Sequence, residues 1–231
     1  MNVYAGFDQR EAAGFHTFTQ SLIEQGSFKN VTAMSGAQAD GTNTFTYERF
    51  RVPEIEVWSG RALFLDASDM LLRAPLSELF ALYDSKYAVQ VVKHDYRTKH
   101  PRKYRGTEME ADNEDYPRKN WSSLILWNCG HRAHFKARDQ IRAAIANGDG
   151  KFLHRFGWLE DDQIGGLPVE WNWLPDEQGK NVNAKLLHFT TGLPVIRAHV
   201  HVPHAQAWFA AKAMSLETPA ERRIAELASA R

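Results

Sequence analysis

Two aspartates, Asp66 and Asp69, directly follow a short apolar run and are the first candidates for chemistry. Residues 62–65 lack helical spacing, which is typical of a strand buried on both faces of a parallel α/β sheet. Asp66 would then lie at the carboxyl edge of the sheet, where ligands bind in open α/β folds. A hard divalent cation would balance the two acids and keep positions open for phosphate oxygens. The alternative is that Asp66 caps the following segment and Asp69 is solvated.

A second polar cluster comprises Asp161, Asp162 and Gln163, which we place at the start of a short helix. Two carboxylates and an amide at a helix start can bind a ligand. They are equally common as plain caps, because acids are favoured at the positive end of the helix dipole.

Two further positions end predicted strands. His188 ends the apolar strand expected at 184–189, and Gly192 would let the backbone approach a ligand closely. Asn128 follows the strand expected at 123–127. The simpler alternatives are a hydrogen-bonded core histidine and an edge turn.

Composition limits the possible partners. The 231 residues include 28 basic and 28 acidic side chains, so net charge does not favour nucleic acid or a membrane. The single cysteine, Cys129, cannot form an internal disulfide, which fits a reducing cytoplasm. We find no signal peptide and no apolar run long enough for a transmembrane segment, so we expect a cytoplasmic protein.

Strand and helix patterns alternate along the chain, which predicts an α/β fold with a mostly parallel central sheet flanked by helices and a helical C-terminal end. We expect one domain over 1–203 with a long loop or flap inserted at 93–120, and a helical extension at 204–231 packed on it. Strands are expected at 2–6, 31–34, 62–65, 87–92, 123–127 and 184–189, and helices from Phe15 to Gly26 and at 75–83, 131–146, 204–214 and beyond Pro219.

In this order and context, five sequence blocks resemble the glycosyltransferases of the GT-A fold, similar to the family 8 retaining galactosyltransferases and glycogenin-like enzymes. The resemblance covers most of residues 1 to about 196. The blocks are Y-E-R-F-R, A-L-F-L-D-A-S-D-M-L, L-W-N-C-G, D-D-Q and L-L-H-F-T-T-G-L-P.

The resemblance implies a metal site. Asp66 and Asp69 correspond to the D-x-D motif of the family, and His188 to the histidine that joins these acids on the cation at the nucleotide diphosphate. A mixed shell of oxygen and imidazole ligands favours Mn²⁺, with Mg²⁺ possible.

The resemblance also implies a donor site. Asp8 matches an acid near the base and ribose, and Arg49 a donor-binding arginine. Asp162 and Gln163 match the pair that contacts the donor sugar, and Asn128 falls near that sugar.

The chain departs from the family pattern at two places. Its acids are spaced D-x-x-D, so Ser68 occupies the usual second position, and Asp69 can serve only if the turn bulges by one residue. Leu193 replaces a lysine that meets the diphosphate in the family. That charge could come from Lys185, Arg197 or a basic residue of the central loop.

The reaction implied is transfer of a sugar with retention from a nucleotide diphosphate donor, by resemblance a UDP-sugar. The acceptor is an unknown glycan, lipid or protein. Developing charge on the leaving diphosphate would be stabilised by the cation. Because the amide of Gln163 is a poor nucleophile, we expect front-face attack by the acceptor hydroxyl.

Two other classes of function compete with this one. The basic loop 93–105, with interleaved tyrosines, could bind single-stranded nucleic acid, but acids at 108–115 follow it and no nucleic acid partner is expected. His199, His201 and His204 could hold zinc in a hydrolase if 199–201 were a strand with both histidines on one face.

Overall fold

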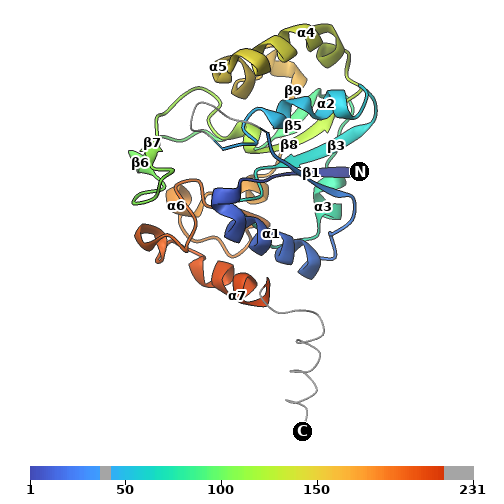
Figure 1. Ribbon diagram of the computed structural model, residues 1–231. Helices are drawn as coiled ribbons and strands as arrows, with labels where there is room; N and C mark the ends of the chain where they lie inside the picture. Colours follow the sequence, from blue (N-terminus) through green and yellow to red (C-terminus); the bar gives the residue numbers. More distant parts are fainter. Residues whose placement is uncertain (37–42, 216–231) are drawn as a thin grey trace.

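A six-stranded sheet forms the centre of the computed structural model, which describes residues 1–36 and 43–215 (Figure 1). The strand order is β2-β1-β3-β8-β5-β9. Two small sheets, β10-β4 and β6-β7, lie outside it. The strands are β1 (Asn2–Gly6), β2 (Val31–Met34), β3 (Arg61–Leu65), β4 (Met70–Leu72), β5 (Val89–Val91), β6 (Arg102–Lys103), β7 (Ala111–Asp112), β8 (Leu124–Asn128), β9 (Ile164–Gly166) and β10 (Leu186–His188).

The direction of one strand decides which residues share an edge of this sheet. β1 pairs in parallel with β2 and β3, and β5 pairs in parallel with β9, whereas β8 runs antiparallel between β3 and β5. The carboxyl ends of the five parallel strands therefore meet at one edge, together with the amino end of β8. The prediction of a mostly parallel sheet is confirmed.

Helices cover both faces of the sheet, as expected for strands whose apolar side chains point both ways. The helices are α1 (Ala12–Glu24), α2 (Val52–Ile55), α3 (Leu76–Phe80), α4 (Arg132–Asn147), α5 (Gly150–His154), α6 (Pro175–Gln178) and α7 (Ala205–Ser215). Short 3-10 helices are η1 (Gln9–Glu11), η2 (Glu48–Arg51), η3 (Trp121–Ser123), η4 (Asp161–Gln163), η5 (Val169–Asn172) and η6 (Arg197–His199).

The core is divided between the two faces. On one face α2, α4 and α5 pack around Phe64 and Trp127, and on the other α1 and α3 pack around Leu63 and Leu65. A third cluster joins α7, through Trp208, to β4 and β10. The sheet is thus the middle layer of three, with α4 and α5 on one side and α1 and α7 on the other (Figure 1).

Local chemistry sets the helix ends. The imidazole of His131 accepts a hydrogen bond from the backbone N–H of Ala133 and caps α4, and Gly148 ends α4 in the left-handed conformation. Pro75 precedes α3, but α3 ends at Phe80 rather than at Tyr83 as expected. The helix predicted beyond Pro219 lies outside the described residues. Within 1–36 and 43–215, no helix combines the length and apolar character needed to cross a bilayer.

Of two short segments, one has the expected secondary structure and one does not. Asp161, Asp162 and Gln163 form the short 3-10 helix η4, as expected for a short helix that starts there, and lead into β9. The predicted strand at 199–201 is absent, because the chain turns through η6 there. The form of so short a segment is decided by tertiary partners rather than by a periodic apolar pattern.

A buried histidine makes stability depend on pH. The side chain of His134 is buried beneath α4, where Nε2 donates to the carbonyl of Ala88 and Nδ1 accepts from the indole of Trp158. Burial lowers the pKa of His134 to about 4, and the nearby His131 acts in the same direction. An unfolded histidine binds its proton near pH 6.5, so the unfolding free energy falls as the pH drops from about 6.5 towards 4.

We expect His134 alone to account for a loss on the order of 3 kcal/mol across this window. The variant His134→Gln should be less stable at pH 7, because it loses a hydrogen bond, but its unfolding free energy should decline less steeply on acidification. Urea unfolding at a series of pH values measures both slopes. Equal slopes in the two proteins would contradict the assignment.

Candidate active site

A cavity of about 300 Å³ opens at the carboxyl edge of the sheet. Asp66 reaches it from the end of β3, and Ser122 and Ser123 from η3 ahead of β8. His188 enters from β10, and the segment between β5 and β8 contributes Lys103. The antiparallel course of β8 is what brings its amino end, rather than its carboxyl end, to this edge.

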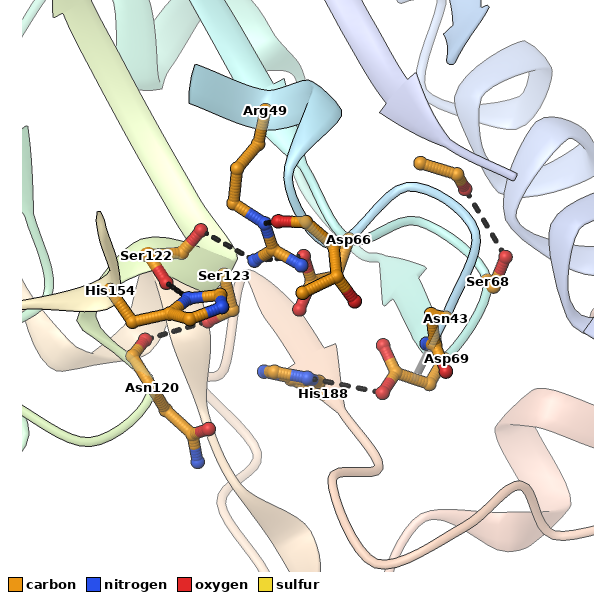
Figure 2. A network of polar contacts seen from close by, with 12 residues as sticks. Asn43, Arg49, Asp66, Ser68, Asp69, Asn120, Ser122, Ser123, His154 and His188 are labelled. Atoms are coloured by element: carbon orange, nitrogen blue, oxygen red, sulfur yellow. Dashed lines mark hydrogen bonds and ion pairs between the residues drawn. The ribbon is translucent and has the colours of Figure 1, made fainter. Parts of the chain in front are cut away.

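The turn after β3 determines which residue stands beside Asp66. Ala67 is left-handed, with φ of 52°, and the hydroxyl of Ser68 turns away to donate to the carbonyl of Gly6 at 3.1 Å. This extra residue in the turn directs Asp69 towards His188 (Figure 2). The structure therefore brings Asp69, and not Ser68, next to Asp66 and His188.

Asp66, Asp69 and His188 form a compact set of ligand atoms. One atom from each residue lies within 4.8 Å of the others, and His188 Nε2 is 3.3 Å from Asp69 Oδ2. Asp69 Oδ1 is buried and has no hydrogen-bond partner within the described chain. An unpaired buried carboxylate oxygen is costly. Two carboxylates, one of which has this unpaired oxygen, and an imidazole fit a divalent cation.

A buried amide orients the histidine. Asn172 in η5 donates through Nδ2 to Ser123 Oγ at 2.8 Å, so its Oδ1 accepts from Nδ1–H of His188 at 2.9 Å. That bond leaves Nε2 facing Asp69. Such outer partners fix the tautomer and orientation of metal-binding histidines. The sequence analysis did not single out Asn172 as a site residue, although it follows the buried core residue Trp171.

Arg49 is the main cation against the acids. Its guanidinium lies 2.6 Å from Asp66 Oδ1, donates to the carbonyls of Thr46 and Ser122, and stacks 5.0 Å from the centre of the Phe64 ring. Arg49 lines the cavity, and its contacts hold the carboxylate of Asp66 in place (Figure 2). Burial raises the pKa of Asp66 to about 6, against the lowering effect of Arg49.

The remaining charges in this region are coupled. Burial disfavours the imidazolium of His188, but the carboxylates of Asp69 and Asp66 outweigh it and raise the pKa of His188 above its ordinary value. Glu11, buried close by and hydrogen-bonded by Asn43, has a pKa well above the usual range because of burial and the charges of Asp69 and Asp8. These acids lie too close together to be ionised without a counter-charge.

A serine–histidine pair forms another part of the wall. Ser122 Oγ and His154 Nδ1 are 2.7 Å apart, and both residues line the cavity. Burial, together with the charges of Arg49 and Lys103, lowers the pKa of His154 to about 3. The ring is thus neutral at physiological pH and is a weak base. Nothing in the local pattern around His154 marked it as a site residue.

The structure separates the three candidates for the missing diphosphate lysine. Leu193 is buried in the cluster with Trp208. Lys185 pairs with Glu78 at 2.7 Å away from the cavity, and Arg197 is exposed on η6. Lys103, from the central loop, lines the cavity. Of these basic candidates, the one that lines the same cavity as Asp66, Asp69 and His188 is therefore Lys103 in the central loop.

The prediction that Asn128, Asp162 and Gln163 face the same site is wrong. Asn128 pairs with Arg61 at the start of β3, about 15 Å along the strand from Asp66. The backbone of Ala88, just before β5, accepts from Asn128 and donates to Gln163. These residues thus lie at the amino edge, because β8 runs antiparallel and Gln163 precedes β9 instead of following it.

The side chains at that edge have local partners. Gln163 Oε1 accepts from the backbone N–H of Glu160, and Asn128 donates to the carbonyls of Ser85 and Tyr87. Asp162 is exposed on η4. None of these three lines the cavity that holds Asp66.

Asp8 and Gly192 lie close to the site but do not line the cavity. Asp8 caps η1, pairs with Arg10 at 2.7 Å and accepts from the N–H of Thr44, so it holds the loop that carries Asn43. Gly192 has a φ of 141°, and a Cβ there would lie 3.0 Å from the ring of His199. Its close approach is to a histidine of η6.

The three histidines behind the competing zinc-hydrolase function have separate surroundings. His199 is buried by Gly192 in η6, His201 is exposed, and His204 accepts from the backbone of Asn181. Over residues 1–36 and 43–215, the one set of three side chains that could hold a metal ion is Asp66, Asp69 and His188.

The basic loop is also compensated internally. Arg102 pairs with Glu110 and Asp112, and Lys99 donates to the carbonyl of Glu177. No continuous basic stripe remains along residues 93–105.

Comparison with known proteins gives one sequence relative and several structures. No protein-family model matches the chain. Protein CDI of Arabidopsis thaliana is 32% identical over 225 residues, which cover 89% of this chain and 83% of that protein.

The structural neighbours are glycosyltransferases. The galactosyltransferase LgtC, in complex with donor and acceptor sugar analogues, aligns with a TM-score of 0.63 at 15% identity over 96% of this chain and 99% of its own. GlyE of Streptococcus pneumoniae aligns with a TM-score of 0.59 at 13% identity over 91% of this chain and 59% of its own. The bifunctional glycosyltransferase WbbM aligns with a TM-score of 0.59 at 15% identity, covering 98% of this chain and 51% of its own. The chain has the GT-A fold, which confirms the fold prediction.

The close approach of α1 to the turn between Asp66 and Asp69 gives a test. A Cβ on Gly14 would lie 1.8 Å from the carbonyl oxygen of Ser68. We expect Gly14→Ala to lower the unfolding free energy by about 2–4 kcal/mol, despite the better helix propensity of alanine, and to weaken Mn²⁺ binding by displacing Asp69. Urea unfolding and calorimetry measure the two effects.

Gly166→Ala is the matched control, because a Cβ at Gly166 meets nothing within 4 Å. It should change the unfolding free energy by less than about 0.5 kcal/mol. A Gly14→Ala protein as stable as this control would contradict the proposed constraint.

Proposed function

This chain belongs to the family of the Arabidopsis thaliana protein CDI, and we propose that it is a metal-dependent glycosyltransferase that uses a nucleotide diphosphate sugar. The observation that carries the proposal is the set formed by Asp66, Asp69 and His188, with an unpaired carboxylate oxygen, in a cavity at the carboxyl edge of a GT-A sheet. Ligands of open α/β sheets bind at this edge.

Asp66, Asp69 and His188 would hold the cation, with Arg49 orienting Asp66 and Asn172 orienting His188. When bound, a divalent cation of this kind neutralises charge that develops on the leaving diphosphate. The oxygen and nitrogen donors support Mn²⁺ as the preferred ion.

Lys103 would meet the diphosphate within the cavity. It belongs to the central segment, lines the cavity and would supply the positive charge that Leu193 does not provide. A fixed positive group aimed at developing negative charge stabilises the transition state directly. The donor nucleotide is proposed to be uridine on the sequence resemblance.

The lining of the cavity supports transfer with retention. Among the described residues that line it, the carboxylates are Asp66 and Asp69, both assigned to the cation, and the imidazole of His154 is a weak base. An inverting enzyme needs a separate general base for the acceptor hydroxyl. Front-face attack, in which the departing phosphate oxygen accepts the proton, needs none. Gln163 has no part in this proposal, because it lies at the other edge.

The donor site is tested by calorimetric titration of UDP with and without Mn²⁺. We expect binding to require Mn²⁺ and to be lost in Asp69→Asn and His188→Ala. Asn172→Ala should weaken Mn²⁺ binding about 10- to 100-fold, and Asn172→Asp should restore it, because a carboxylate can still accept from Nδ1–H. UDP release from a panel of UDP-sugars then tests the activity.

Asp162→Asn and Gln163→Ala are the matched controls, chosen from the residues at the amino edge. Both should bind UDP and Mn²⁺ like the wild type. Metal-independent binding, or binding lost equally in the controls, would refute the site.

The role of Lys103 is tested separately. Lys103→Ala should weaken UDP binding by about tenfold or more, because a hydrogen bond to a charged group is lost, and should leave Mn²⁺ binding intact. Lys185→Ala removes a lysine that is paired with Glu78 outside the cavity and should have no effect. Parallel effects of the two substitutions would show that Lys103 does not contact the diphosphate.

A further inference from the structure

An exposed apolar patch lies at the amino edge of the sheet, far from the cavity that holds Asp66. It consists of Ile55, Val57, Trp58 and Phe135, from the end of α2 and the outer face of α4, and we name it the α2–α4 patch. Val57 is 78% exposed, Phe135 51% and Ile55 47%. The rings of Trp58 and Phe135 meet edge to face, with their centres 6.1 Å apart. Figure 1 shows α2 and α4 on the same side of the sheet.

The backbone at the tip of the patch is strained. Val57 and Trp58 are both left-handed, with φ of 52° and 55°. This conformation is unfavourable for a bulky residue and especially for a β-branched one. Backbone bonds from Val57 to Glu54 and from Trp58 to Pro53 hold the turn. The strained turn exposes Val57 to solvent, so packing of this side chain does not offset the strain. Strain of this kind points to a function.

The helix around Phe135 is basic in a chain of zero net charge. α4 contains Arg132, Lys136, Arg138 and Arg142 against the single acid Asp139, which gives it a net charge of +3. The guanidinium of Arg138 lies 4.3 Å from the centre of the Phe135 ring. Arg142 also pairs with Glu54 at 2.7 Å and thereby ties α4 to α2.

A polar cavity of about 520 Å³ adjoins the basic helix. Arg132 and Lys136, which flank Phe135 along α4, line it together with Trp158 and one acid, Glu160. Two cations and an amphipathic indole beside exposed apolar side chains are what an anionic lipid headgroup and its acyl chains would contact.

We propose that the α2–α4 patch docks on an anionic phospholipid membrane, with Val57, Trp58 and Phe135 entering the interface and α4 facing the headgroups. Apolar burial and attraction between basic residues and anionic lipid add together in this mode of binding. Because the cavity with Asp66 lies at the opposite edge of the sheet, it would stay open to solvent on a docked molecule.

Cosedimentation of the full chain with vesicles tests this. We expect binding to vesicles of phosphatidylcholine mixed with phosphatidylglycerol, little binding to phosphatidylcholine alone, and release by salt. Val57→Asn should lower the bound fraction about tenfold. Asparagine tolerates the left-handed conformation better than valine, so this variant should be at least as stable as the wild type and its loss of binding cannot come from misfolding.

Matched controls come from the same chain. Val182→Asn removes another exposed valine, 70% accessible and outside the patch, and should bind like the wild type. Arg132→Glu with Lys136→Glu should remove the preference for anionic vesicles, whereas Arg197→Glu, on η6, should keep it. Equal binding by Val57→Asn and wild type, absence of anionic preference, or a dimer in light scattering that Val57→Asn dissociates would overturn the proposal.

Discussion

The carboxylates of Asp66 and Asp69 lie side by side with little access to water. Balancing their negative charge is the main electrostatic constraint on this molecule. Asp66 and Asp69 meet in one cavity with the buried Glu11 close by, and the guanidinium of Arg49 pairs with Asp66. Like charges so close cannot all be ionised at neutral pH unless a cation joins them. The left-handed Ala67, the inward turn of Asp69 and the hydrogen bond from His188 to the amide of Asn172 all support this arrangement. The side chains around the cavity therefore leave negative charge that a bound cation would balance.

The direction of each strand in the sheet determines which side chains reach this cavity. Because β8 runs against its neighbours, its amino end and the serines before it reach the cavity, and Asn128 goes to the far edge. Gln163 also lies at the far edge, because it directly precedes β9, which runs parallel to β5. Strand direction cannot be read from a short apolar run, since the same run fits either orientation. Sequence blocks that resemble parts of one site can thus lie at opposite ends of the strands of a sheet.

Local sequence predicted much of the rest. The strands at 2–6 and 31–34 coincide with β1 and β2, and the helix expected at 131–146 coincides closely with α4. Asp66, Asp69, His188 and Arg49 meet at one cavity as the resemblance implied. Asn172, Ser122 and His154 were missed because their partners lie 16 to 49 residues away in the chain, and no periodic pattern encodes such pairs.

The segment that carries Lys103 is attached to the rest of the protein differently from the strands of the central sheet. Lys103 belongs to a hairpin of two residues per strand, β6 with β7, whose outer side is held by surface ion pairs of Arg102. Exposed pairs of this kind contribute about 1 kcal/mol or less each. The inner side is anchored more firmly, because Tyr104 is buried and its backbone N–H donates to the carbonyl of Thr191. The hairpin forms a sheet of its own, so displacing it would expose Tyr104 but break no hydrogen bond between strands of the central sheet. Entry and exit of a bulky anionic molecule then need not involve the layers that give the protein its stability.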